Sequence, residues 1–324
     1  MNLRQLYDRA IAIGMENDPR GRETILRDLE AKKKDYDALK EDEKGVFDPE
    51  TLRHPYADSR MLNGTGEEEI TGILVGIDIE VGELLLFDRL KEKGMKVDLV
   101  AAHHPGGRAY AKLYDVMRMQ SDILHRYGIP ISTAEDLMEG RIKEVERKLL
   151  PVNHTRTVDA ARLLGIPFIC LHTPADNMVA TYLQGRFDEE KPYTIADVMD
   201  ILKGIFEYRE AARNGAGPQI LIGSQKRKAG RIFVDMTGGT EGSKEIFESM
   251  ASSGINTVVA MHLSEEHRKE AEKNHLNVVI AGHISSDSLG LNLLLDELVR
   301  GIAAPFEISE CSGFRRFSRL PAPA

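Results

Sequence analysis

The chain has 324 residues, of which 42% are hydrophobic and 29% charged, and its formal net charge is −9 at pH 7. This length suits one large α/β domain or two lobes, and the acidic balance argues against non-specific binding to nucleic acid or anionic lipid. We find neither a signal peptide nor an apolar run approaching the roughly 18 residues of a membrane span. With only Cys170 and Cys311, we expect unpaired thiols and a cytoplasmic protein.

The first 65 residues differ in pattern from the rest of the chain. A first helix is indicated by apolar residues at helical spacing, namely Leu3, Leu6, Tyr7, Ala10 and Ile11. A second, strongly charged helix is expected after Asp18-Pro19, and it carries only a narrow apolar stripe. We therefore expect residues 1–65 to form a helical arm that packs on the main body or on another subunit.

From residue 70 onward, short apolar runs alternate with amphipathic segments such as the expected helix over 81–94. The expected strands are 70–79, 97–102, 129–132, 166–172, 219–224, 231–236, 256–262 and 277–283. This alternation predicts an α/β fold with mainly parallel sheets covered by helices. We place one α/β lobe at 66–187 and a second at 188–324, separated near the polar segment 184–194.

Three of the expected strands end in side chains that can bind a metal. They are His103 and His104 in VAAHHP, His172 and Asp176 in ICLHTPADN, and His283 and Asp287 in VVIAGHISSD. Ligands of open α/β sheets bind beyond the carboxyl ends of the strands, and a four-residue step puts a histidine and an aspartate on one face of a helix. Imidazole and carboxylate suit zinc, iron or manganese. Each strand end taken alone is better explained by a structural histidine, but the coincidence at three ends favours a metal site.

The two adjacent histidines argue for more than one ion. Successive side chains of a strand point to opposite faces, so His103 and His104 could each reach a different ion, with a carboxylate such as Asp176 between them. A pair of ions about 3.5–4 Å apart is the arrangement used for metal-assisted hydrolysis.

At these residues the sequence resembles the Nif-three-like family, whose members are also called GTP cyclohydrolase 1 type 2 homologues. The matching motifs are His-His-Pro at 103–105, His-Thr-x-x-Asp at 172–176 and Gly-His-x-x-x-Asp at 282–287. The resemblance covers roughly residues 70–300 and implies a dinuclear metal centre between two α/β lobes. It implies five metal ligands, which are His103, His104, Asp176, His283 and Asp287. It also implies a homo-oligomer, expected to be a toroidal hexamer.

The sequence departs from this family at three places. Asp287 stands where the family usually has glutamate, so its contact with metal could be longer or water-mediated. The segment between His104 and Asp176 is longer, with an extra helical piece around 135–164. The family's Asp-Asn-Val-Gly-Leu stretch is not recognisable in residues 54–69, which affects substrate recognition more than metal binding.

Further candidates each have a structural alternative. Asp78 either hydrogen-bonds a ligand histidine or caps the helix that follows it. In MTGGTEGSK (236–244), Gly238, Gly239 and Thr240 either bind an anion through backbone N–H groups or form a tight turn. The non-ligand residues that could act as acid or base beside the metals are His172, Glu241 and His262.

These observations predict a protein that binds two divalent ions and hydrolyses a small molecule, either a nucleotide or a phosphorylated compound. The ions would polarise the substrate and activate water. The alternative is a non-catalytic metal-binding protein that handles metal or regulates a partner. A covalent hydrolase and a dinucleotide enzyme have no support, because neither a nucleophile elbow nor a Gly-x-Gly-x-x-Gly fingerprint is present.

Overall fold

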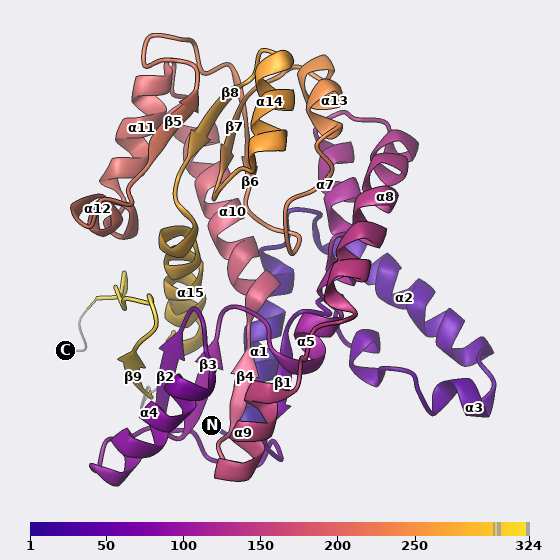
Figure 1. Ribbon diagram of the computed structural model, residues 1–324, viewed down its shortest axis with the longest axis vertical. Helices are drawn as coiled ribbons and strands as arrows, with labels where there is room; N and C mark the ends of the chain where they lie inside the picture. The colour runs from indigo at the N-terminus through magenta and orange to yellow at the C-terminus, as the bar shows by residue number, and fades with distance from the viewer. Residues whose placement is uncertain (301, 303–305, 322–324) are drawn as a thin grey trace.

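The computed structural model describes residues 1–300, 302 and 306–321 and contains two sheets, one above the other in Figure 1, with helices around them. Both sheets are mostly parallel, as the sequence predicted. Within the described residues no helix is long and apolar enough to cross a membrane.

The first sheet has the strand order β1-β4-β3-β2-β9. Only β1 runs antiparallel to its neighbour, and the last strand comes from the C-terminal part of the chain. The bounds are β1 (Arg60–Asn63), β2 (Gly72–Gly76), β3 (Leu99–Ala102), β4 (Phe168–Cys170) and β9 (Glu307–Glu310). Strands β2, β3 and β4 are buried along their whole length, which explains their continuous apolar sequences. Helices α4 (Val81–Glu92) and α9 (Arg156–Leu164) pack against each other beside this sheet.

The second sheet has the order β5-β8-β7-β6, and again only the first strand is antiparallel. Its strands are β5 (Gln219–Ile222), β6 (Arg231–Asp235), β7 (Ile255–Ala260) and β8 (Asn277–Ile280). The helices of this half are α11 (Ile195–Gly204), α12 (Phe206–Arg213), α13 (Ile246–Ser252) and α14 (Glu265–Lys273).

Helices occupy the long segment after β3. They are α5 (Gly107–Ala111), α6 (Leu113–Val116), α7 (Met119–Arg126) and α8 (Ile131–Leu149), followed by α9. The extra helical piece expected around 135–164 is therefore present. The strand expected at 129–132 is wrong, because Pro130 lies at the N-cap of α8 and that helix begins at Ile131. Ile129 is buried in the core, so the apolar run reflects packing at a helix start.

Two long helices connect the sheets and pack closely on each other, α10 (His172–Glu190) and α15 (His283–Val299). Each begins at a histidine just after a strand, β4 for α10 and β8 for α15. Gly290 allows the close approach, since a Cβ atom there would lie 2.4 Å from the carbonyl oxygen of Ala175.

The N-terminal segment comprises α1 (Leu3–Glu16), α2 (Arg22–Ala38), α3 (Glu41–Lys44) and the 3-10 helix η1 (Pro49–Leu52). Helix α1 packs on both α10 and α15 and buries its apolar side, so it belongs to the main body. Helix α2 buries only Ile25 and extends away from the sheets together with α3 (Figure 1). The boundaries drawn at residues 65 and 187 stay predictions.

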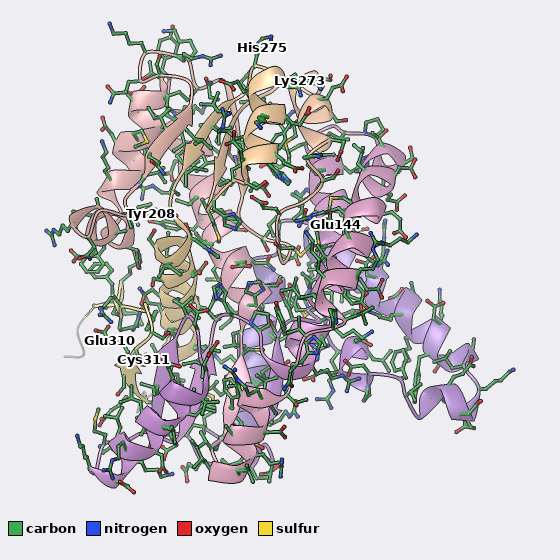
Figure 2. The ribbon with its side chains drawn as sticks, in the orientation of Figure 1. Glu144, Tyr208, Lys273, His275, Glu310 and Cys311 are labelled. Atoms are coloured by element: carbon green, nitrogen blue, oxygen red, sulfur yellow. The ribbon has the colours of Figure 1, made fainter. Side chains whose placement is uncertain are left out.

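Both cysteines are free thiols in the part of the chain that the structure describes, as expected. Cys170 is buried in β4, and Cys311 follows β9 directly, beside Glu310 (Figure 2). The thiol on β4 and the thiol just past the end of β9 are therefore separated by β3 and β2.

Candidate metal centre

The side chains that the sequence singled out meet where α10 and α15 begin, at the carboxyl end of β3. Asp176 and Asp287 each lie one turn into their helix, four residues after His172 and His283. This is the helical spacing that the sequence suggested, and the crossing at Gly290 brings the two first turns together.

His103 lies between the two carboxylates. Its Nε2 atom is 3.3 Å from Oδ1 of Asp176 and 3.4 Å from Oδ1 of Asp287. All three side chains are buried, with 1%, 4% and 1% of their residue surface exposed. These atoms form one group of potential ligands.

A second group shares Asp287. Its other oxygen, Oδ2, is 3.4 Å from Nε2 of His104 and 3.6 Å from Nε2 of His283. Asp287, rather than Asp176, therefore faces both groups, one oxygen toward each. Both oxygens of the shorter aspartate thus face histidine nitrogens, and the longer or water-mediated contact with metal expected at this position stays a prediction.

Buried polar atoms without a partner make this cluster suitable for cations. Both ring nitrogens of His103, Oδ1 of Asp176 and both carboxylate oxygens of Asp287 have no hydrogen-bond partner among the described residues. Each such atom costs about 1–3 kcal/mol when left unpaired. A divalent ion with oxygen and nitrogen ligands would satisfy them, so the residues present fit a metal.

The charges in the cluster also favour a bound cation. Burial disfavours a charge on His103, but the carboxylates of Asp287 and Asp176 outweigh it and raise the pKa of His103 to about 10. Burial likewise opposes a charge on Asp287, yet the neighbouring His103, His104 and His283 hold its pKa well below the usual range. The Asp287 carboxylate therefore stays ionised and attracts positive charge.

Asp78 orients His104. The Nδ1–H of His104 donates to Oδ1 of Asp78 at 2.7 Å, which leaves Nε2 facing Asp287. A carboxylate that fixes the tautomer in this way is the usual partner of a metal-binding histidine.

Asp58 makes the same kind of contact with His172, and the sequence did not reveal it. The Nδ1–H of His172 donates to Oδ2 of Asp58 at 2.7 Å, across 114 residues of chain. Asp58 lies just before β1, inside the segment 54–69 where the family's usual stretch is not recognisable. A single aspartate in a loop carries no local signal, so only the folded chain identifies it.

Glu241 and His262 form a pair at the edge of the cluster. Oε1 of Glu241 lies 3.2 Å from Nδ1 of His262, and it also accepts a hydrogen bond from the backbone N–H of Ser264 at 2.7 Å. Burial raises the pKa of Glu241, but His262 and this N–H outweigh it and lower the pKa to about 2. The rings of His262 and His283 are 4.9 Å apart, so this pair adjoins the candidate metal ligands.

The glycine-rich loop at 236–244 is hydrogen-bonded to helix α7. The side-chain amide of Gln120 donates to the carbonyl oxygens of Gly238 at 2.7 Å and Thr240 at 2.8 Å. Gly238 has a φ of 97°, and a Cβ atom there would lie 2.6 Å from Cγ of Gln120. These contacts explain the glycines as a tight turn, while anion binding by the loop stays a prediction.

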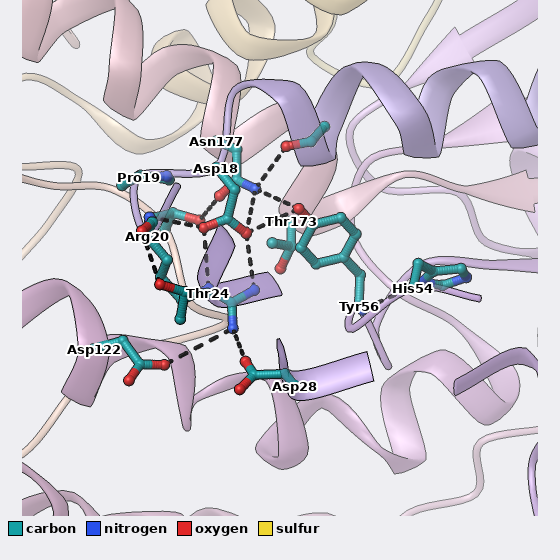
Figure 3. Close-up of polar contacts among 12 residues, drawn as sticks. Asp18, Pro19, Arg20, Thr24, Asp28, His54, Tyr56, Asp122, Thr173 and Asn177 are labelled. Carbon is teal, nitrogen blue, oxygen red and sulfur yellow. Dashed lines mark hydrogen bonds and ion pairs between the residues drawn. The ribbon is translucent and has the colours of Figure 1, made fainter. Parts of the chain in front are cut away.

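A buried polar network fixes the backbone next to Asp176 (Figure 3). The side-chain amide of Asn177 donates to Gly14 O and to the hydroxyl of Tyr56, both at 3.1 Å. Tyr56 in turn donates to Asp18, which forms a buried 2.9 Å ion pair with Arg20. The N-terminal segment thereby positions the first turn of α10.

The cluster opens onto a cavity of about 1720 Å³ that is lined by residues of both lobes. His104, His172, Asp176, His283 and Asp287 line it, as do Glu241 and His262. Its wall also carries cationic side chains, namely Arg126, Arg141, Lys148, Arg156, Lys191 and Arg231.

Two α/β lobes joined by crossing helices, with a buried His/Asp cluster at the crossing, define a fold with a candidate metal site between its lobes. A NIF3 superfamily protein from Sphaerobacter thermophilus matches this architecture with a TM-score of 0.68 and 26% sequence identity, over 79% of this chain and 91% of that one. The chain thus has the structure of NIF3 superfamily proteins, and the predicted resemblance to the Nif-three-like family is confirmed.

Two further solved structures match with lower scores. Reduced HcgD from Methanocaldococcus jannaschii has a TM-score of 0.44 and 16% identity, over 78% of this chain and 87% of that one. A Bacillus cereus protein related to NIF3 has a TM-score of 0.40 and 10% identity, over 78% and 89%. No protein-family model and no curated protein matches the sequence.

Proposed function

We propose that the protein binds two divalent metal ions, zinc, iron or manganese, and uses them to hydrolyse a small molecule. The observation that supports this most strongly is the position of Asp287, whose unpartnered oxygens face His103 on one side and His104 with His283 on the other. One ion would be held by His103, Asp176 and Asp287, and the other by His104, His283 and Asp287.

Two such ions supply Lewis acidity for the polarisation of a substrate and the activation of water. The chain's own residues orient the site. Asp78 holds His104 with Nε2 inward, and Glu241 binds Nδ1 of His262, so that Nε2 of His262 is the atom left to hold or pass a proton. His262 lines the cavity, where a bound substrate would meet it.

The substrate we propose is a nucleotide or another phosphorylated small molecule. The cavity of about 1720 Å³ is large enough for such a ligand, and the Arg and Lys side chains in its wall, although outnumbered by carboxylates, offer contacts for a phosphate. The family resemblance supports a cytoplasmic homo-oligomer, with the hexamer as the expected assembly, which light scattering coupled to gel filtration would measure.

Metal content tests the proposal. We expect about two equivalents of metal per chain in untagged protein, and their loss in a folded His103→Ala/His283→Ala variant. His125→Ala, an exposed histidine on α7, is the matched control and should keep both ions. A parent protein that neither contains these metals nor takes them up would contradict the proposal. If two ions bind but nucleotides and phosphoesters are not hydrolysed, a metal-handling or regulatory role replaces the hydrolase.

A further inference from the structure

His172 lies against the same cluster as the five proposed ligands. Its ring centre is 4.9 Å from that of His103 and 5.8 Å from that of His104. One nitrogen from each of these three histidines lies within 4.8 Å of the others, a spacing that allows a common metal ion. The side chain is only 8% exposed and borders the cavity.

The surroundings of Asp58 determine which nitrogen of His172 carries the proton. Asp58 is completely buried, and its Oδ2 accepts hydrogen bonds from Nδ1–H of His172 and from the hydroxyl of Thr173, both at 2.7 Å. The hydroxyl of Ser59 accepts from the backbone N–H of His172 at 3.0 Å. Because both donors meet the same carboxylate oxygen, Asp58 acts as the acceptor and holds the proton of His172 on Nδ1.

Nε2 of His172 is consequently the nitrogen with a lone pair. It lies 3.7 Å from Oδ2 of Asp176, beyond hydrogen-bond distance, and no donor among the described residues binds it. Oδ1 of the same carboxylate is the oxygen nearest to His103. The lone pair of His172 therefore faces the side of Asp176 that the proposed ligand set leaves unused.

We propose that His172 is a fourth histidine ligand of the metal centre and that Asp58 is its positioning residue. The inference rests on the proposed function, because it needs metal at the cluster. The Asp58–His172 pair repeats the arrangement of the Asp78–His104 pair. In each, a carboxylate accepts a hydrogen bond from Nδ1–H and so orients the imidazole of a ligand histidine. With His172, the set of ligands that the sequence motifs imply gains one residue, which lies on the side of His103.

Zinc affinity and the coordination of bound zinc test the inference. His172→Gln and Asp58→Asn are compared with the parent by competition titration and by X-ray absorption, which reports the number of imidazoles around zinc. We expect the affinity to fall about 10–100-fold in Asp58→Asn, as for other carboxylate partners of metal-bound histidines, and by at least as much in His172→Gln, which removes the ligand itself. With four histidine ligands shared by two zinc ions, the average number of imidazoles per zinc should decrease from about 2 to about 1.5 in His172→Gln.

His54→Gln is the matched control. His54 is also a buried histidine, but it contacts the hydroxyl of Tyr7 at 3.1 Å instead of the cluster, so its loss should leave the imidazole signal unchanged. His172→Ala with added imidazole separates loss of a ligand from loss of folding, and recovered zinc affinity in that variant supports the inference.

Parental affinity together with an unchanged imidazole signal in His172→Gln would overturn the inference and leave the metal centre in place. A parent that binds no zinc would instead overturn the proposed function. The two failures are therefore distinguishable in one set of measurements.

Discussion

The crossing of α10 and α15 offers a direct test of how the fold builds the site. Replacement of Gly290 by alanine would place a methyl group 2.4 Å from the carbonyl oxygen of Ala175 and 2.9 Å from its carbonyl carbon. Ordinary contacts between such atoms are about 3.5 Å, so the two helices must move apart by roughly 1 Å. Ala175 precedes Asp176, and Gly290 follows Asp287 by less than one turn, so this movement separates the two carboxylates.

The magnitude follows from two opposing effects. Overpacking of a close-packed interior costs about 1–3 kcal/mol, and the value should lie near the upper end because a backbone carbonyl has no alternative rotamer. Alanine is better than glycine in a helix interior by about 1 kcal/mol. We therefore expect Gly290→Ala to lower the free energy of unfolding of the metal-free protein by about 2 kcal/mol and to weaken metal binding.

Urea unfolding and a metal titration measure the two effects. Gly185→Ala is the matched control, because Gly185 is exposed on the same helix α10 and its added Cβ would meet nothing within 4 Å. That variant should gain stability, by about 1 kcal/mol, and bind metal normally. Parental stability and parental metal affinity in Gly290→Ala would refute the reasoning that this glycine sets the spacing of Asp176 and Asp287.

Other substitutions probe the site and its surroundings. Asp287→Asn should abolish binding of both ions, whereas Asp176→Asn should affect only one, as elemental analysis would show; equal losses would argue against a shared Asp287. Arg20→Met leaves the buried Asp18 carboxylate without its partner and should lower the free energy of unfolding by about 3–5 kcal/mol in urea titrations. Burial raises the pKa of Asp235 to about 6, so the stability that its protonated form contributes is lost as the pH rises from about 4 to 6. Asp235→Asn should therefore be more stable than the parent at pH 7 by about 3 kcal/mol, and an unchanged difference between pH 4 and pH 7 would contradict this.

Much of the fold was predictable because it depends on local pattern. Buried parallel strands are short continuous apolar runs, and the runs around Val100 and Val279 were found on that basis. The run at 129–132 failed for the same reason, since an apolar pair next to Pro130 has the composition of a short strand whether it enters a sheet or begins a helix. Local pattern also could not show that α1 packs on α10 and α15, because its apolar face fits several partners.

Some residues of the site could likewise be predicted from local sequence pattern, and others could not. His103, His283 and Asp287 could be identified because each lies at a strand end or one helical turn beyond it, where ligands of α/β folds gather. Their convergence was expected from the coincidence of three strand ends and from the family resemblance, whereas no spacing along the chain predicts that two helices cross at Gly290. Asp58 reaches His172 from more than a hundred residues away, and nothing in its neighbourhood distinguishes it from a surface aspartate.

The position of β9 has a consequence for synthesis of the chain. Glu307 in β9 pairs beside Gly72 in β2, more than two hundred residues earlier. A nascent chain therefore carries β2 with one edge uncovered until β9 has left the ribosome. His103 and Asp176 are made long before Asp287, so the early part of the chain can offer only an incomplete set of metal-binding groups. Synthesis of α15 and β9, rather than folding of the first sheet's earlier strands, should be the moment at which metal can be retained.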